Sequence, residues 1–175
     1  MSTLVSVVVP TYRRPEMLER CLKALLAQRF PADAFEIVVA DDGPDEATRR
    51  TVRELALRTG GAPEIRYVPV TGSQGPAGAR NRGWEAADSP VIAFTDDDTL
   101  PQPGWLVEGF QVILASPRHL AATGRVVMPR ARCGARSSSR SRIPPYRPAR
   151  GLSRNPWACG PWATAPRRAL SPPGV

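Results

Sequence analysis

The chain of 175 residues and 19.0 kDa has room for one compact domain and little more, which excludes two catalytic domains. Its composition, 42% hydrophobic and 23% charged, is typical of a soluble globular protein, and no apolar run approaches the roughly 20 residues of a membrane span. The net charge of +8 comes from residues 129–175, which hold ten Arg and no Asp, Glu or Lys, whereas the first 128 residues are slightly acidic.

Short β-branched runs alternate with longer amphipathic stretches over the first 128 residues, which predicts an α/β fold with a mostly parallel sheet. Strands are predicted over 4–9, 36–40, 65–70, 91–94 and 120–128, with Pro10 ending the first of them. Helices are predicted after Pro15, after an N-cap at Asp45, over 77–87 and over 105–114. In the first helix, apolar residues recur at helical spacing from Met17 to Leu26.

Residues 129–175 have no periodic apolar face and consist mainly of Arg, Pro, Ala, Ser and Gly, so we predict a domain over 1–128 followed by a disordered tail. A basic arm for nucleic acid or anionic lipid is one interpretation. The same five residue types are those that G- and C-rich codons encode, and the segment holds no acidic residue. We therefore favour translation in a shifted reading frame, and we expect no nucleic-acid partner.

The cysteines and the single histidine do not indicate a metal centre or a disulfide framework. Cys21, Cys133 and Cys159 lack the short spacing of zinc ligands, and His119 is the only histidine. We therefore expect a soluble protein of the reducing cytoplasm. Attachment to the surface of the inner membrane would leave no mark in the hydropathy pattern and stays open.

Two motifs follow the first two predicted strands, at the edge of a parallel sheet where ligands bind. Pro10, Thr11 and Tyr12 end the first strand, at a position where a nucleotide can rest. The second strand ends in Asp-Asp-Gly, and the carboxylate of Asp42 is the better candidate to accept hydrogen bonds from a base or a ribose hydroxyl. A Pro turn and a capped, solvated corner are the alternative interpretations of these patterns.

The segment 75–83 places small residues at the start of a predicted helix. Free N–H groups at a helix start favour binding of an anion. Arg80 or Arg82 can contact a diphosphate or a base, and Arg80 lies one turn into the predicted helix. Tight packing of the helix against the sheet explains the small residues equally well.

Three consecutive carboxylates, Asp96, Asp97 and Asp98, follow the strand predicted over 91–94. Neighbouring carboxylates repel one another, and a bound divalent cation offsets that cost. Hard oxygen ligands favour Mg²⁺ or Mn²⁺. In an extended backbone Asp96 and Asp98 face one side and Asp97 the other, so we expect the outer pair to form the site. A solvated acidic turn is the alternative.

In this order the four motifs resemble the N-terminal half of the family 2 glycosyltransferases, over about residues 4–128. The resemblance implies the GT-A fold, a Rossmann-like α/β fold of nucleotide-diphospho-sugar transferases. It also implies inverting, metal-dependent transfer of a sugar from a UDP-, GDP- or dTDP-sugar to a hydroxyl of a polysaccharide, lipid or small molecule. By resemblance, the nucleoside would contact Pro10, Thr11, Tyr12 and Asp42, the base and phosphates would lie near Arg80, and ribose and Mg²⁺ or Mn²⁺ would be held by Asp96 and Asp98.

Members of this family take their general base, an Asp or Glu, from an acceptor-binding half that follows the acidic motif. No acidic residue follows Glu108 in this chain. An acceptor hydroxyl needs a positioned base to lose its proton as it attacks. We therefore expect a truncated transferase with no catalytic base assigned, and an inactive remnant that binds only nucleotide or metal is the alternative.

Overall fold

The computed structural model describes residues 3–72, 75–118 and 120–127. The described residues up to Gly124 belong to one unit, and residues 125–127 belong to a second, of which no more is described. The tail predicted over 129–175 lies outside the described residues. The elements, in chain order, are β1 (Val5–Thr11), α1 (Pro15–Leu26), the 3₁₀ turn η1 (Ala32–Ala34), β2 (Phe35–Asp41), α2 (Glu46–Arg58), β3 (Glu64–Pro69), α3 (Pro76–Glu85), β4 (Val91–Phe94) and α4 (Trp105–Leu114).

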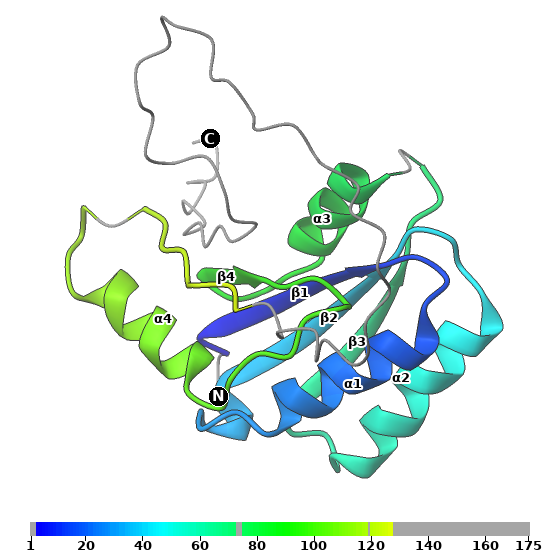
Figure 1. The fold of residues 1–175 in the computed structure, drawn as a ribbon, viewed down its shortest axis with the longest axis horizontal. Coiled ribbons are helices and arrows are strands. Elements are labelled where there is room, and N and C mark those ends of the chain that lie inside the picture. The colour runs from blue at the N-terminus through cyan, green and yellow to red at the C-terminus, as the bar shows by residue number, and fades with distance from the viewer. Residues whose placement is uncertain (1–2, 73–74, 119, 128–175) are drawn as a thin grey trace, which may run out of the picture. The chain divides into compact units, whose positions relative to one another are not determined.

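The four strands form one parallel sheet in the order β3-β2-β1-β4 (Figure 1), which confirms the predicted α/β class. Strand β1 pairs with β2 along its whole length and with β4 over Val5–Val8. Because the strands are parallel, their carboxyl ends lie at one edge of the sheet. The segments that follow β1, β2 and β4 are thereby brought together.

Pro10 lies inside β1 rather than after it, so the predicted strand end is wrong. Residues of a parallel strand bond alternately to its two neighbours, and the Val8 carbonyl accepts a hydrogen bond from the Thr95 N–H on the β4 side at 3.1 Å. Pro10 faces the same side, but β4 has already ended at Phe94, opposite Val8. The missing N–H of Pro10 therefore costs no ladder bond, and the strand continues to Thr11.

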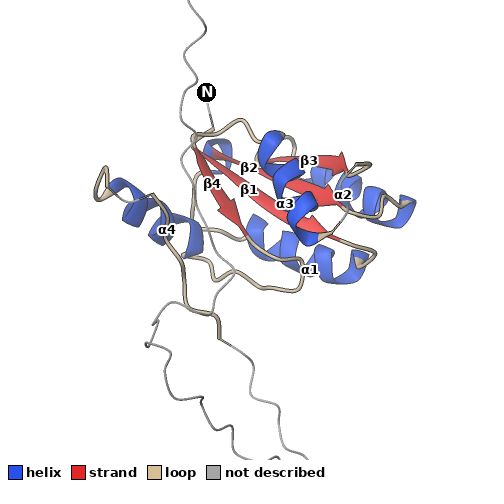
Figure 2. Cartoon of the chain, turned by 90° about the horizontal axis from the view of Figure 1, so that it is seen from above, coloured by secondary structure: helices blue, strands red, loops and turns tan. Residues whose placement is uncertain are grey.

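Helices cover both faces of the sheet (Figures 1 and 2). One face packs against α1, α2 and α4 and holds the larger apolar cluster, in which Leu18, Leu22 and Leu25 of α1 are fully buried, as their spacing predicted. The other face packs against α3 and the turn that follows it, through Val8, Val38, Ala87 and Ile92. Both faces are therefore buried, as the near-continuous apolar strands require.

The remaining predicted elements of the first 118 residues match the structure to within two residues at their ends. Asp45 caps α2 as expected, because its carboxylate accepts a hydrogen bond from the Thr48 N–H at 2.8 Å. The strand predicted over 120–128 is wrong: residues 120–127 form no regular element, and Leu120 and Val127 are exposed. A β-branched run becomes a strand only where a neighbouring strand offers a ladder, which the pattern alone does not reveal. No helix of the described ranges is long and apolar enough to cross a membrane.

A buried polar network ties β2 to β3 and to the turn that follows α3. The side chain of Glu36 is 3% exposed, and its Oε2 lies 2.7 Å from Arg66 Nη2. Glu36 Oε1 accepts hydrogen bonds from the Ser6 hydroxyl and, at 3.0 Å, from the Asp88 N–H. Arg66 also pairs with the Asp88 carboxylate at 2.9 Å. The buried carboxylate is therefore compensated by one guanidinium and two further donors.

Gly83 allows α3 to lie close to the sheet. A Cβ atom at this position would clash with Val8 Cγ1 and would lie 3.3 Å from Ala40 Cβ. Tight packing therefore explains at least this small residue of the segment 75–83.

Gly83→Ala is expected to have a free energy of unfolding about 1–3 kcal/mol lower than Gly109→Ala, because Ala gains roughly 1 kcal/mol of helix propensity in both variants and only Gly83→Ala overpacks the contact with the sheet. Gly109→Ala in α4 is the matched control, since its added Cβ meets no described atom within 4 Å. Urea unfolding of both variants measures the difference. A Gly83→Ala variant as stable as Gly109→Ala would contradict the packing argument.

Candidate functional site

A pocket of about 360 Å³ lies where β1, β2 and β4 end and α3 begins. Its lining consists of Pro10, Thr11, Tyr12, Arg14, Asp42, Pro76, Ala79, Arg80, Asp96, Asp97 and Asp98. The structure thus brings together the residues that the sequence suggested for a nucleotide or metal site, with the exception of Arg82. Arg82 is exposed and pairs with Glu85 of the same helix at 3.2 Å, so Arg80 is the arginine of α3 at the pocket. The structure adds Arg14 and Asp97, which the sequence analysis left out.

The two carboxylates at the end of β2 have different surroundings. Asp41 is fully buried and accepts hydrogen bonds from the Tyr67 hydroxyl at 2.8 Å and the Gly43 N–H at 3.2 Å. Burial, together with this carboxylate, raises the pKa of Tyr67 to about 12, so Tyr67 stays a donor at neutral pH. Asp42 instead faces the pocket, and its two oxygens lie 3.0 and 2.8 Å from the Gly75 nitrogen. Asp41 therefore shapes the corner, and Asp42 links it to the start of α3.

The Tyr12 ring lies at the rim of the pocket and is 52% exposed. The Arg13 guanidinium lies 5.3 Å from the ring centroid, and a Cβ atom on Gly43 would lie only 2.6 Å from Tyr12 Cε2. Arg13 itself adopts a left-handed backbone with φ of 52°, which is uncommon for a non-glycine residue. This tight turn places Tyr12 and Arg14 at the same pocket, with the ring seated against the glycine.

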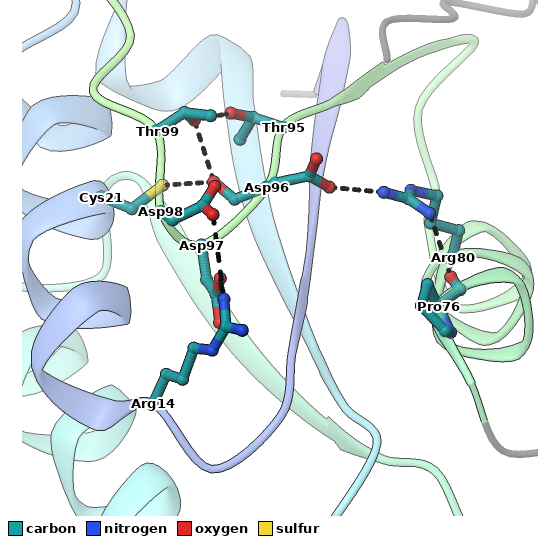
Figure 3. Close-up of polar contacts among 9 residues, drawn as sticks. All are labelled: Arg14, Cys21, Pro76, Arg80, Thr95, Asp96, Asp97, Asp98 and Thr99. Carbon is teal, nitrogen blue, oxygen red and sulfur yellow. Dashed lines mark hydrogen bonds and ion pairs between the residues drawn. The ribbon is translucent and has the colours of Figure 1, made fainter. Parts of the chain in front are cut away.

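The acidic motif is a turn and not an extended strand. Strand β4 ends at Phe94, and Asp97 and Asp98 lie in the turn that follows. The predicted alternation, with Asp97 pointing away from the site, is wrong, because all three carboxylates line the pocket. Figure 3 shows Asp96 directed toward Arg80, and Asp97 and Asp98 directed toward Arg14.

Each carboxylate of this turn has a different environment. Asp96 Oδ1 accepts a hydrogen bond from Arg80 Nη2 at 2.5 Å. Asp97 is buried, and its Oδ2 accepts a hydrogen bond from the Thr11 hydroxyl at 2.7 Å. Burial raises the pKa of Asp97, although the Thr11 hydrogen bond and the nearby Arg14 charge act in the opposite direction. The Asp98 side chain is 55% exposed, and Arg14 Nη1 lies 3.8 Å from its Oδ2.

Hydrogen bonds from α1 and from two threonines support the backbone of the acidic turn. The Cys21 thiol donates to the Asp96 carbonyl at 3.5 Å, and the Thr99 hydroxyl donates to the same oxygen at 2.9 Å (Figure 3). Thr95 and Thr99 share a hydrogen bond of 2.5 Å between their hydroxyls. Burial raises the pKa of Cys21 to about 12, so the thiol keeps its proton and remains a donor. Cys21 is thus a buried residue of α1, as predicted, that also supports the acidic turn.

Asp97→Asn is expected to stabilise the protein at neutral pH by about 1 kcal/mol, because Asn keeps an acceptor for Thr11 and removes a buried charge. A carboxyl whose pKa rises on folding above its usual 3.8 holds its proton more tightly in the folded state. The charged form therefore costs stability as the pH rises through the folded pKa, and the advantage of Asn should vanish below pH 3.8. Urea unfolding across this range measures the difference, and a wild type more stable than the variant at neutral pH would contradict it.

The donor set of the turn fits a divalent cation that is shared with a ligand. Within the ranges that the structure describes, no group of three or more His, Cys, Asp or Glu side chains could hold a metal ion. Mg²⁺ sites commonly use one or two carboxylates and complete their shell with phosphate oxygens and water. The exposed Asp98 carboxylate meets that requirement, and Asp96 retains Oδ2 besides the oxygen that binds Arg80.

Comparison with known proteins identifies the family. The family model described as Glycosyl transferase family 2 matches residues 6–169, which extends into the segment predicted as a tail. Glycosyltransferase AglE of Haloferax volcanii is 30% identical over 109 residues, which cover 62% of this chain and 35% of that protein. Validoxylamine A glucosyltransferase of Streptomyces hygroscopicus is 38% identical over 104 residues, which cover 59% of this chain and 24% of that protein.

Solved structures show the same fold. The mannosyltransferase PcManGT from Pyrobaculum calidifontis, in complex with GDP-Man and Mn²⁺, matches with a TM-score of 0.62 at 29% identity, over 69% of this chain and 35% of that one. S. aureus TarS in complex with UDP-GlcNAc matches with a TM-score of 0.54 at 24% identity, which supports the fold alone. The matched region spans 35% or less of the lengths of AglE, the glucosyltransferase and PcManGT. The fold is that of the GT-A glycosyltransferases, and the chain belongs to glycosyltransferase family 2.

Proposed function

We propose that this chain carries the donor-binding part of an inverting glycosyltransferase that moves a sugar from a UDP-, GDP- or dTDP-sugar to an acceptor hydroxyl. The observation that carries the proposal is the convergence of Asp42, Arg80, Asp96 and Asp98 on one pocket at the carboxyl edge of a parallel sheet. Family membership and the likeness to a mannosyltransferase solved with GDP-Man and Mn²⁺ support it. The acceptor and a place in the cytoplasm remain predictions from the sequence.

We assign the nucleoside to the side of the pocket formed by the ends of β1 and β2. The exposed Tyr12 ring, seated against Gly43, offers a flat apolar surface on which a base can stack, with Pro10 and Thr11 beside it. The Asp42 carboxylate, which accepts the Gly75 N–H, can also accept a hydrogen bond from a base N–H or a ribose hydroxyl. The nucleoside would therefore bridge the corners that follow the two strands.

We assign the diphosphate to the side formed by α3 and the acidic turn. Pro76 and Ala79 place the first turn of α3 at the pocket, and Arg80 adds a guanidinium there. Asp98, together with Asp96, would hold Mg²⁺ or Mn²⁺, whose charge would stabilise the departing nucleoside diphosphate. Arg80 would supply a second positive charge while it orients Asp96.

Binding without transfer is a second candidate function, and the environments of the pocket carboxylates favour it. Glu108 lies outside this pocket and lines a separate, apolar cavity of about 230 Å³ beside β4 and α4. Of the carboxylates in the nucleotide pocket, Asp42 and Asp96 accept hydrogen bonds from protein donors, and Asp97 is buried. The base that an attacking hydroxyl requires is therefore not assigned.

Titration calorimetry of the full chain with UDP, GDP and dTDP tests the binding half of the proposal. We expect at least one nucleotide to bind with Mn²⁺ and to bind much more weakly with EDTA. Release of that nucleotide from its sugar donor, with and without candidate acceptors, then separates transfer from binding alone. Failure of all three nucleotides to bind with Mn²⁺ would reject both functions.

A further inference from the structure

Two arginines contact the acidic turn from opposite sides, and their ion pairs with it differ in length (Figure 3). Arg80 Nη2 lies 2.5 Å from Asp96 Oδ1, and its side chain is 34% exposed, so this is a hydrogen-bonded ion pair. Arg14 Nη1 lies 3.8 Å from Asp97 Oδ1 and 3.8 Å from Asp98 Oδ2, and its side chain is 55% exposed. These distances are too long for hydrogen bonds, so Arg14 is held by charge alone.

The two carboxylates beside Arg14 depend on it to different degrees. Asp97 is anchored independently, because its other oxygen accepts the Thr11 hydroxyl at 2.7 Å. Asp98 is largely exposed, and among the ion pairs of the described residues Arg14 is the cation paired with it. Arg14 therefore supplies the positive charge that offsets the repulsion between these neighbouring carboxylates.

We infer that the Arg14 guanidinium competes with a divalent cation for the Asp98 carboxylate, so that binding of the cation displaces Arg14 from Asp98. The inference rests on the metal-dependent site proposed above. A divalent cation brings twice the charge and binds oxygen directly, whereas Arg14 gives up only a long, solvated attraction. The tighter, less exposed Arg80–Asp96 pair would stay in place.

Arg14 can be replaced without removing a structural contact of α1. It occupies the N-cap position of this helix, but its side chain makes no capping hydrogen bond, and Pro15 opens the first turn. Arg20 lies exposed on the same helix and forms no ion pair among the described residues, so it provides a matched control for the loss of one positive charge.

The test measures the binding of Mn²⁺ to the full chain at low ionic strength. Binding is monitored by the decrease in the electron paramagnetic resonance signal of free Mn²⁺. Arg14→Gln is expected to bind Mn²⁺ about fivefold more tightly than the wild type, and the gain should shrink at high salt. Arg14→Lys keeps the charge and should bind like the wild type. Arg20→Gln should stay within about twofold of the wild type, because its charge is screened from the pocket. In an Asp98→Asn background, Arg14→Gln should lose most of its gain.

The outcomes separate the inference from the proposed function. If the wild type binds Mn²⁺ and Arg14→Gln binds it equally or more weakly, the competition does not exist. Equal gains in Arg14→Gln and Arg20→Gln would also overturn it, because net charge alone would then explain the effect. If neither the wild type nor any variant binds Mn²⁺, alone or with GDP or UDP, the proposed metal-dependent function itself fails.

Discussion

Asp98→Asn is expected to weaken Mn²⁺-dependent binding of GDP or UDP by about tenfold or more, because a neutral amide oxygen is a poor ligand for a hard divalent cation. The Asp98 side chain is 55% exposed and makes only a long contact with Arg14, so the free energy of unfolding should change by no more than about 0.5 kcal/mol. Calorimetry with Mn²⁺ and with EDTA isolates the metal-dependent part of the affinity. Unchanged affinity would remove Asp98 from the site.

Asp97→Asn is the matched comparison for this variant, since it makes the same chemical change one residue away. We expect a smaller loss of affinity, because Asp97 is buried and one of its oxygens is already bonded to Thr11. The reason is burial and not strand alternation, since both side chains line the pocket. Equal losses in the two variants would show that Asp97 also coordinates the cation.

Arg66→Met is expected to lower the free energy of unfolding by about 3–5 kcal/mol, because it leaves the buried Glu36 carboxylate without its counter-ion. The Ser6 hydroxyl and the Asp88 N–H would still bond to Glu36, but neither carries a positive charge. Domains of this size are stable by only about 5–15 kcal/mol, so the loss would be a large share of the total. Urea unfolding monitored by circular dichroism measures it.

Two control variants make this stability prediction specific. Adding Glu36→Gln to Arg66→Met removes the uncompensated charge, and we expect it to restore part of the lost stability. Arg53→Met, at an exposed position of α2, should change the free energy of unfolding by less than about 0.5 kcal/mol. A loss in Arg53→Met as large as that in Arg66→Met would mean that the buried pair is not the cause.

The helices and most strands were predictable because their apolar residues recur at the period of the element that buries them. Leu18 and Leu22 show this in α1. The ends of the strands were less predictable, because they depend on neighbours that the pattern does not name. Pro10 is tolerated in β1 only because β4 has already ended, and the missing fifth strand lacked a described partner.

The site residues were predictable as a set, but their orientations were not. Because the motifs follow strands of a parallel sheet, the sequence was sufficient to predict that Asp42, Arg80 and the acidic motif lie at one edge of the sheet. The direction of Asp97 depends on a turn supported by Cys21, which lies 75 residues away from Asp96 in the sequence. Arg14 was missed because its role arises from that turn, although its place just after the Pro-Thr-Tyr corner offered a signal.

Because β4 lies beside β1 in the sheet, we expect the pocket to be the last part of the sheet to assemble. Ser6 and Glu36 bring β1 and β2 together across 30 residues, whereas the Thr11–Asp97 contact closes a loop of 86 residues. Closing the longer loop costs more chain entropy and is expected later on the folding path. A ligand that touches the ends of β1, β2 and β4 together therefore binds only after β4 has docked. We therefore expect such a ligand to slow unfolding and to leave the rate of folding nearly unchanged.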